Sequence, residues 1–363
     1  MRRVGIVGAG QLGRMLALAS YPLGITCEFL DRSPDTPGAQ VAPSLIGPLE
    51  DPALLAELAA RNDVVTFDWE NIAGAALAPL ERATLIRPPR AALEVSQDRL
   101  HEKALFKRLR IPVAPHAPVE NAADLERAVA RWGLPGVLKT RRMGYDGKGQ
   151  YLLRAPRDLE HALAAIGTDA LIYEQFQPFT REISIIGARD ARGRIVCYPL
   201  SANVHAGGIL RYGLAPYANA RLARRAREYL AKLMRALDYI GVLAIEFFVV
   251  RGRLVANEMA PRVHNSGHWT IEGCITSQFE NHLRAICDLP LGSTRPLGHT
   301  AMINFLGEMP SRQALLDIDG LAFHDYGKEP RPGRKLGHCT IVKRTIHERD
   351  QALETALRII RWS

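Results

Sequence analysis

The N-terminal residues predict one chain topology, a strand that turns through glycines into a helix and then a second strand. An apolar run at 3–7 leads into Gly8-Ala9-Gly10-Gln11-Leu12-Gly13, a helical pattern covers 14–20, and another apolar run covers 26–30. The glycines let the chain turn tightly and bring backbone N–H groups to the start of a helix, where they can bind a phosphate. The chain is therefore expected to begin with a βαβ unit on a parallel sheet, as in Rossmann-like α/β domains.

Two interpretations of this glycine turn differ in the ligand. Asp31 lies 18 residues after Gly13 (31 − 13), which is close to the spacing of a dinucleotide-binding fingerprint and would fit an NAD-dependent oxidoreductase. A tight turn between strand and helix that binds no nucleotide has the same pattern. The turn alone leaves both interpretations open.

Composition places the chain among globular enzymes of two or three domains. It has 363 residues, of which 47% are hydrophobic and 23% charged, and this length is sufficient for several hydrophobic cores. No apolar run approaches the roughly 18 residues that a membrane span needs. Residues 1–8 have the pattern of a strand and not of a signal peptide. A cytoplasmic protein with no membrane partner is expected.

The charge predicts an anionic partner. The net charge is +9 with a pI near 9.5, but the basic residues are spread along the chain and show no interleaved aromatic and basic patch. Phosphorylated small molecules therefore fit better than nucleic acid. The five cysteines have no C-x-x-C spacing, so neither a zinc site nor a disulfide framework is indicated.

Two glutamates lie on neighbouring apolar runs, at 242–250 and 254–259, which together predict a β-hairpin. If the loop is the three residues 251–253, Glu246 faces Glu258 across the ladder, where like charges are destabilising unless a cation neutralises them. Mg²⁺ would do so, because it prefers carboxylate and phosphate oxygens. A two-residue turn would instead place the acids on opposite faces. The simpler alternative leaves one acid in solvent and the other capping Arg262.

A second phosphate-binding device is predicted in the middle of the chain. A strand at 136–139 ends in Lys139, a glycine-rich loop follows at 140–150, and a strand resumes at 151–154. The lysine places a cation at a fixed depth, and the loop's N–H groups can fold over phosphates as a lid. An ordinary exposed turn is the alternative. The P-loop pattern G-x-x-x-x-G-K-[ST] is absent from the sequence.

Other segments are assigned from hydrophobic periodicity. Expected helices cover 52–60, 74–80, 96–109, 221–237 and 350–360, and expected strands cover 63–68, 171–176, 181–186, 300–306 and 338–343. The segment 85–91, with its two prolines, is expected to be a connection that closes the first α/β domain.

Several motifs occur in a recognisable order. They are Gly-Gln-Leu-Gly-Arg-Met at 10–15, Asp-Arg-Leu at 98–100, Gly-Tyr-Asp-Gly-Lys-Gly-Gln at 144–150, Ala-Pro-Arg-Val-His-Asn-Ser-Gly-His-Trp-Thr at 260–270 and Arg-Pro-Gly-Arg-Lys-Leu-Gly-His at 331–338. In this order they resemble the ATP-grasp superfamily over nearly the whole chain. In detail they resemble the N5-carboxyaminoimidazole ribonucleotide synthase (PurK-type) family.

The resemblance implies an ATP-dependent ligase of purine biosynthesis. Such an enzyme uses ATP and Mg²⁺, with Mn²⁺ as a possible substitute, to activate bicarbonate as carboxyphosphate and to carboxylate 5-aminoimidazole ribonucleotide. It further implies an N-terminal pre-ATP-grasp domain (1–95), an ATP-grasp domain with a glycine-rich lid (96–295), a small C-terminal domain (296–363) and a homodimer. A formate-dependent glycinamide ribonucleotide transformylase or a biotin carboxylase is the alternative within the superfamily.

The resemblance also implies roles for individual residues. Glu246 and Glu258 would be the metal ligands. Residues implied for ATP are Arg99, Lys139, Gly144, Tyr145, Asp146, Gly147, Lys148, Gly149, Gln150, Glu174, Gln175, Phe176, Gln177, Glu182, His205, Asn257 and Glu258. Residues implied for catalysis are Arg262, His264, Asn265 and Lys328, of which the first three would surround bicarbonate and carboxyphosphate. Residues implied for the ribonucleotide are Gly10, Gln11, Leu12, Glu70, Tyr145, Lys328, Arg334 and Lys335.

Some of these positions have structural alternatives, and others depart from the family pattern. His264 and especially His268 could be hydrogen-bonded structural histidines, and the basic cluster at 328–335 could be a solvated turn. Asp68 stands where the family usually has Glu, Met143 where the lid usually has Gly, and Ala206-Gly207 where a polar or basic residue and Asp are usual. These changes put the His205 contact and the details of the lid in question, not the reaction.

Overall fold

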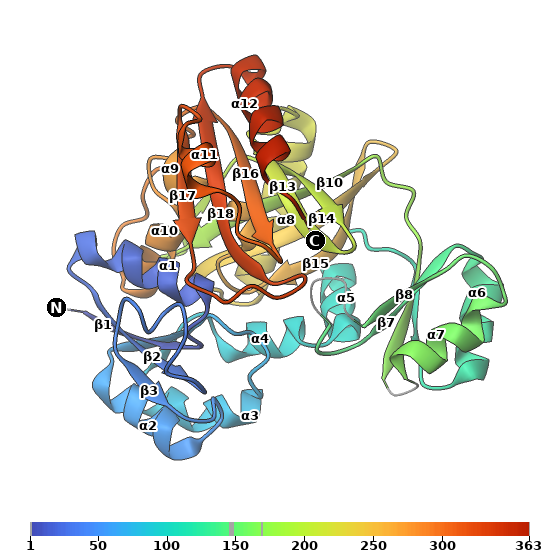
Figure 1. Cartoon of the computed structure of the whole chain (residues 1–363). Helices are drawn as coiled ribbons and strands as arrows, with labels where there is room; N and C mark the ends of the chain where they lie inside the picture. Colours follow the sequence, from blue (N-terminus) through green and yellow to red (C-terminus); the bar gives the residue numbers. More distant parts are fainter. Residues whose placement is uncertain (1, 145–148, 168–169, 363) are drawn as a thin grey trace.

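The computed structural model describes residues 2–144, 149–167 and 170–362. It has three sheets (Figure 1). The first belongs to the N-terminal unit, the second to the unit that follows it along the chain, and the third is shared by the rest of the chain. The α/β class and the three-domain organisation predicted from the sequence are confirmed. Among the described residues, no helix combines the length and the apolar character that crossing a membrane requires.

The N-terminal unit is a parallel five-stranded sheet in the order β3-β2-β1-β4-β5. As predicted, β1 pairs with β2 in parallel, with Val7 opposite Leu30. The helix after the glycine turn begins at Gln11, three residues before the predicted start (14 − 11). The elements are β1 Arg3–Val7, α1 Gln11–Ser20, η1 Tyr21–Leu23, β2 Thr26–Asp31, β3 Ser44–Ile46, α2 Pro52–Arg61, β4 Val64–Phe67, α3 Gly74–Leu77, η2 Ala78–Arg82 and β5 Leu85–Ile86.

Two helices follow where one was expected over 96–109. Helix α4 spans Arg90–Ser96 and α5 spans Arg99–Arg108. The break arises because Asp98 has extended backbone geometry and its carboxylate accepts the Leu100 N–H at 3.0 Å, which caps α5. The cap places Arg99 at the first position of a new helix. The predicted boundary between residues 95 and 96 falls inside α4.

The second unit is a small four-stranded antiparallel sheet in the order β6-β9-β7-β8. Figure 1 shows it set apart from the remainder of the molecule, with its two helices packed together on one side. A separate apolar core, which includes Leu125, Leu138 and Tyr173, holds it together. Its elements are β6 His116–Val119, α6 Ala122–Trp132, β7 Gly136–Thr140, β8 Gln150–Leu153, α7 Asp158–Ile166 and β9 Leu171–Gln175.

The largest sheet joins the central and C-terminal parts of the chain. Its order is β15-β14-β10-β12-β13-β16-β18-β17, and β11 pairs with β10. Strands β16 to β18 thus continue the sheet that carries the paired glutamates. The elements are β10 Arg181–Arg189, β11 Ile195–Cys197, β12 Ser201–Ala206, β13 Ile209–Ala215, α8 Ala220–Ala236, β14 Gly241–Val250, β15 Arg253–Ala260, η3 Asn265–Gly267, α9 Thr270–Gly273, α10 Gln278–Ile286, β16 His299–Leu306, α11 Arg312–Leu316, β17 Leu321–Asp325, β18 Lys335–Lys343 and α12 Ile346–Ile359.

The hairpin β14–β15 brings the two glutamates together by a route that differs from the predicted one. The turn has two residues, since Val250 pairs with Arg253, and this register alone would place the acids on opposite faces. The register shifts by one between Glu246 and Phe247, so that Asn257 is the extra residue of a β-bulge. Glu246 therefore pairs with Glu258. The predicted pairing is confirmed, whereas the predicted three-residue loop is wrong.

Candidate active site

Two cavities of similar size meet between the three sheets. One of about 550 Å³ lies between the four-stranded unit and the large sheet. The other, of about 510 Å³, lies between the N-terminal glycine turn and the C-terminal segment. Both are lined by Arg99, Glu258, His264, Asn265 and Lys335. The shared residues form a junction at which molecules bound in the two cavities would meet.

The paired acids differ in their electrostatic states, with Glu258 at this junction and Glu246 beside it in the first cavity. Burial raises the pKa of Glu246 to about 7, and the charge of Glu258 adds to the rise. Burial acts on Glu258 as well, but the adjacent Arg99 guanidinium outweighs it and holds the pKa of Glu258 below its ordinary value. Near neutral pH the pair thus carries between one and two negative charges, and a divalent cation would neutralise this charge.

The donor set fits Mg²⁺. Among residues 2–144, 149–167 and 170–362, no group of three or more His, Cys, Asp or Glu side chains could hold a metal. Two carboxylates that leave the other positions to phosphate oxygens and water are the usual protein contribution to a Mg²⁺–nucleotide site. Glu246 and Glu258 would be those ligands.

Arg99 reaches the junction from the capped start of α5. Its Nη1 lies 3.0 Å from Glu258 Oε2, and 16% of its side chain is exposed. The cap residue Asp98 also binds the Arg141 guanidinium at 2.8 Å, which ties the start of α5 to the end of β7. Arg99 is therefore a fixed cation beside the acid pair.

A buried cluster of alternating charges lies behind Lys139. Glu174 forms ion pairs with two lysines, with Lys139 Nζ at one carboxylate oxygen and Lys103 Nζ at the other, each at 3.1 Å. Burial alone would raise the pKa of Glu174, but the two ammonium groups lower it to about 2. Sequence analysis missed Lys103, whose side chain is fully buried and which also approaches the Asn257 carbonyl at 3.4 Å.

The chain after β9 forms an apolar shelf in the first cavity. Phe176 lies 6.4 Å from Phe179 between ring centroids, and Phe179 stacks on Phe248 at 4.7 Å. The backbone N–H of Gln175 donates to Pro115 O and that of Phe176 to Pro135 O, so the strand end is fixed on both sides. A planar base could lie on this shelf. Gln177 also lines the cavity.

Glu182 and His205 lie further along the same cavity. His205 Nδ1 is 3.1 Å from Glu182 Oε2. Burial lowers the pKa of His205, but the bond to Glu182 and the charge of Glu246 outweigh it and leave a net rise. The structure thus places His205 in the cavity despite the unusual Ala206-Gly207 that follows it.

The segment after β15 supplies the polar groups of the junction. Arg262 Nη2 bonds Glu70 Oε1 at 2.9 Å. Burial, with the charges of Arg262 and Lys335, holds the pKa of His264 well below its ordinary value, so its imidazole is neutral. Both side-chain polar atoms of Asn265 are buried without a hydrogen-bond partner among the described residues. A ligand could satisfy them, because buried amides normally have partners.

The second cavity gathers the residues predicted for the ribonucleotide. Gly10, Gln11, Leu12, Glu70, Lys328 and Lys335 all line it. Lys328 Nζ bonds Gln11 Oε1 at 2.5 Å, which joins the C-terminal segment to the glycine turn. The predicted Arg334 lines neither cavity, and its guanidinium bonds the Glu329 carbonyl at 3.1 Å.

Side chains of the N-terminal unit contact the backbone of the glycine turn. The Asp31 carboxylate, which the dinucleotide interpretation would assign to a ribose, accepts the Ala9 N–H at 2.7 Å. Burial raises the pKa of Asp68, and the backbone N–H groups of Gly13 and Gly10 oppose that rise. A Cβ at Gly10 would lie 2.6 Å from Asp68 Oδ2, so a larger residue would displace the Asp68 carboxylate. The contacts of Asp31 and Asp68 stabilise the conformation of the turn.

Some of the predicted site residues lie elsewhere or are not described. Tyr145, Asp146, Gly147 and Lys148 lie outside the described residues. Gly144 lines the second cavity, Gln150 and Asn257 line the first, and Gly149 accepts the Thr140 N–H through its carbonyl. Met143 has a φ of 60°, the left-handed conformation that glycine usually supplies. His268 lines neither cavity and is buried against Phe279.

Glu102 predicts a pH dependence of stability that sequence analysis did not foresee. Burial raises its pKa to about 8, while its carboxylate accepts the Met259 N–H at 2.6 Å. Folding then takes up a proton at pH values between the ordinary pKa and 8, so this group's contribution to stability falls as pH rises through that window. Relative to Glu102→Gln, the wild-type protein should lose about 1 kcal/mol of unfolding free energy between pH 6 and pH 7. Denaturant titrations at both pH values measure it, and parallel stabilities would contradict it.

Comparisons with known proteins agree with this geometry. Residues 1–97 match the ribonucleotide synthetase preATP-grasp domain, 104–279 the ATP-grasp domain, and 300–352 the phosphoribosylaminoimidazole carboxylase C-terminal domain. The N5-carboxyaminoimidazole ribonucleotide synthase of Pseudomonas aeruginosa is 46% identical over 339 residues, covering 93% of this chain and 94% of the relative.

Solved structures give the same result. The N5-carboxyaminoimidazole ribonucleotide synthetase of Thermus thermophilus superposes with a TM-score of 0.95 at 48% identity, covering 99% of both chains. The N5-carboxyaminoimidazole synthase of Aspergillus clavatus, solved in complex with ADP and 5-aminoimidazole ribonucleotide, superposes with a TM-score of 0.93 at 30% identity, covering 99% of this chain and 98% of that one.

Proposed function

The chain belongs to the N5-carboxyaminoimidazole ribonucleotide synthase family of ATP-grasp ligases, and from that premise we propose how its two cavities divide the reaction. It is an ATP-dependent ligase with N5-carboxyaminoimidazole ribonucleotide synthase activity in purine biosynthesis. The oxidoreductase interpretation of the glycine turn is therefore set aside. The junction shared by the two cavities is the observation that carries the proposal.

The first cavity takes ATP. Its adenine lies on the shelf formed by Phe176 and Phe179, the ribose hydroxyls bond Glu182, and the phosphates extend toward Lys139 and Arg99. Arg99 lies beside Glu258, and Lys139 is paired with Glu174 in the same cavity. Glu246 and Glu258 would hold Mg²⁺, which would supply positive charge to offset the negative charge that develops on transfer.

The second cavity takes 5-aminoimidazole ribonucleotide. Lys328 and Lys335 provide cations for its phosphate, and Glu70 lies on the cavity wall beside Arg262. The glycine turn at Gln11 closes the same end through its bond to Lys328. On this view the N-terminal glycine turn forms part of the substrate site and does not bind a dinucleotide.

Chemistry takes place at the junction. A bicarbonate oxygen attacks the γ-phosphorus of ATP, the bond to ADP breaks, and carboxyphosphate forms. The exocyclic amine of the ribonucleotide then attacks the carboxyl carbon, phosphate leaves, and the amine loses a proton. Arg262, His264 and Asn265 supply fixed donors around the anion, which stabilise it without reorganisation.

The test is phosphate release from Mg-ATP and bicarbonate, measured with and without 5-aminoimidazole ribonucleotide. We expect release that needs bicarbonate and is stimulated by the ribonucleotide. Formate in place of bicarbonate is expected to give no product, which separates this function from a formate-dependent transformylase. Turnover with formate or biotin, or without any ribonucleotide effect, would overturn the proposal. Sedimentation of the same preparation tests the homodimer that the family resemblance predicts.

A further inference from the structure

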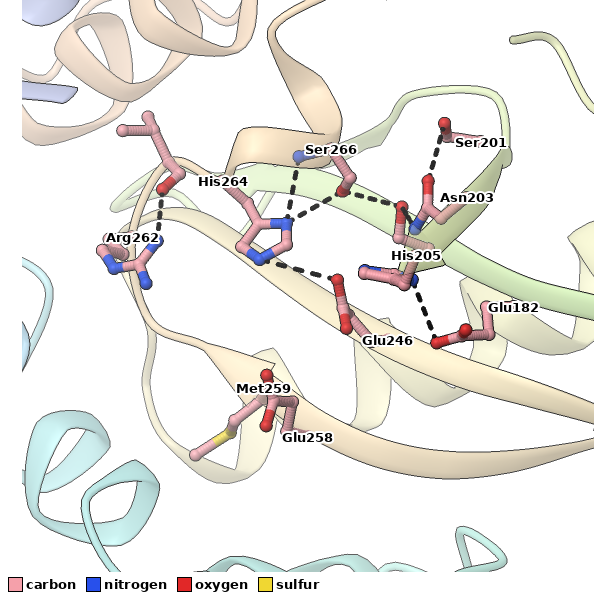
Figure 2. Close-up of polar contacts among 12 residues, drawn as sticks. Glu182, Ser201, Asn203, His205, Glu246, Glu258, Met259, Arg262, His264 and Ser266 are labelled. Carbon is pink, nitrogen blue, oxygen red and sulfur yellow. Dashed lines mark hydrogen bonds and ion pairs between the residues drawn. The ribbon is translucent and has the colours of Figure 1, made fainter. Parts of the chain in front are cut away.

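A chain of buried hydrogen bonds ends on the imidazole of His264 (Figure 2). Ser201 Oγ donates to Asn203 Oδ1 at 3.1 Å, Asn203 Nδ2 donates to Ser184 Oγ at 3.2 Å, and Ser184 Oγ donates to Ser266 Oγ at 2.8 Å. These residues come from β10, β12 and η3 and are at most 5% exposed. None of the four lines either cavity, so the chain lies behind the site.

Each hydroxyl has one hydrogen but can accept two hydrogen bonds, so the direction of the chain is set by a group that can act in only one way. Asn203 Nδ2 can only donate, so Ser184 accepts from it and has its own hydrogen available for Ser266. Ser266 Oγ, which already accepts that hydrogen, gives its hydrogen to His264 Nδ1 at 2.8 Å. The chain therefore delivers a donor to Nδ1.

The backbone N–H of Ser266 sets the direction. The Ser266 N–H lies 3.3 Å from His264 Nδ1, and a backbone N–H cannot accept a hydrogen bond. Nδ1 must therefore be the nitrogen without a hydrogen. In a neutral imidazole the hydrogen is then on Nε2. Nε2 lies 3.7 Å from Glu246 Oε1, beyond ordinary hydrogen-bond length, so its hydrogen is available to a ligand at the junction.

We propose that Ser184, Asn203 and Ser266 are positioning residues that hold His264 in the Nε2–H tautomer, so that His264 donates a hydrogen bond to the anion at the junction and does not act as a base there. The inference rests on the proposed function and adds the chemical role of one residue. A general base would need a lone pair on the nitrogen that faces the ligand, and this tautomer has none. A fixed neutral donor stabilises the anion without giving it a proton.

A second pair of hydrogen bonds holds the main chain of His264. Gln278 is fully buried; its Oε1 accepts the His264 N–H at 2.9 Å and its Nε2 donates to the His264 carbonyl at 2.6 Å. The main chain of His264 is thus clamped on one side while Ser266 fixes the ring on the other. The combination sets both the tautomer and the direction of the Nε2–H bond.

The first test separates a donor from a base by substitution of His264 itself. Glutamine carries an N–H donor near the Nε2 position but cannot act as a base, and leucine can do neither. We expect His264→Gln to keep kcat within about tenfold of wild type and His264→Leu to lose about a hundredfold. Equal losses in the two variants would overturn the donor role.

The second test addresses the positioning residues. Ser266→Ala and Ser184→Ala should lower kcat by about tenfold while leaving KM for ATP unchanged. Ser266→Thr, which keeps the hydroxyl, should recover activity. Ser20→Ala removes an equally buried hydroxyl, which bonds Ala17 O at 2.7 Å in α1, and serves as the matched control.

Nitrogen NMR of the imidazole gives a readout that a folding defect would not imitate. The wild-type spectrum should show the hydrogen of His264 on Nε2, and Ser266→Ala should reduce that population. A hydrogen on Nδ1 in the wild-type protein, or kcat unchanged in both alanine variants, would overturn the inference. Absence of ribonucleotide-stimulated phosphate release in the wild type would instead refute the proposed function, so the two failures are distinguishable.

Discussion

Glu258→Gln is expected to reduce the ribonucleotide-stimulated release of phosphate from Mg-ATP by roughly a thousandfold. Glutamine keeps the shape of the side chain but removes the charge, and a neutral amide is a weaker ligand for Mg²⁺ than a carboxylate. In the wild type Arg99 lies 3.0 Å from Glu258, and the substitution removes this ion pair as well. Steady-state kinetics over a range of Mg²⁺ concentrations measure the effect, and part of the lost activity should return at high Mg²⁺.

The matched control is Glu28→Gln. Glu28 also binds an arginine, with Arg61 Nη1 at 2.9 Å, but it lies on β2 and lines neither cavity. It removes the same charge from a similar ion pair and should leave kcat unchanged. If Glu258→Gln retains activity within tenfold of the wild type, the metal assignment is wrong even if the ATP-grasp function stands.

Lys103→Met should destabilise the protein by about 3 kcal/mol, because removing one partner of a buried ion pair leaves an uncompensated charge. Lys103 is fully buried, and Glu174 would then depend on Lys139 alone. We expect KM for ATP to rise as well, since Lys139 would be held more tightly by Glu174 and be less available to phosphate. Denaturant unfolding and initial rates at varied ATP measure the two effects.

Lys107→Met provides the comparison on the same helix. Lys107 lies one turn further along α5 and is exposed, so the change removes the same charge without breaking a buried pair. Its stability should stay within about 0.5 kcal/mol of wild type. Equal stabilities of the two variants would show that the Lys103–Glu174 pair does not hold α5 against β9.

The sequence was sufficient for the class of the elements that it predicted, and it failed where a distant contact decided the outcome. The hydrophobic runs at 242–250 and 254–259 predict a hairpin, but nothing in them marks Asn257 as a bulge. The pairing of Glu246 with Glu258 was predicted with the wrong turn, and the bulge compensated for the error. Such bulges arise from packing around a site rather than from local preference.

Residues whose partners are far along the chain were missed for a related reason. Lys103 pairs with Glu174, 71 positions away (174 − 103), and only the folded structure brings α5 against β9. Ser184, Asn203 and Ser266 are small polar residues on three elements, and no local pattern distinguishes them from ordinary strand and loop residues. The start of α5 did have a signal, because Asp98 followed by Arg99-Leu100 is a typical N-cap.

The bulge at Asn257 also makes the hairpin tip a practical attachment point. Val249–Leu254 and Val250–Arg253 are the last pairs before the turn, and none of these four residues lines either cavity. Glu246 and Glu258 pair on the side of the bulge that is away from the turn. A peptide tag or fluorophore inserted between Arg251 and Gly252 would therefore leave this pairing intact. An immobilised or labelled enzyme could thus be made without touching the chemistry.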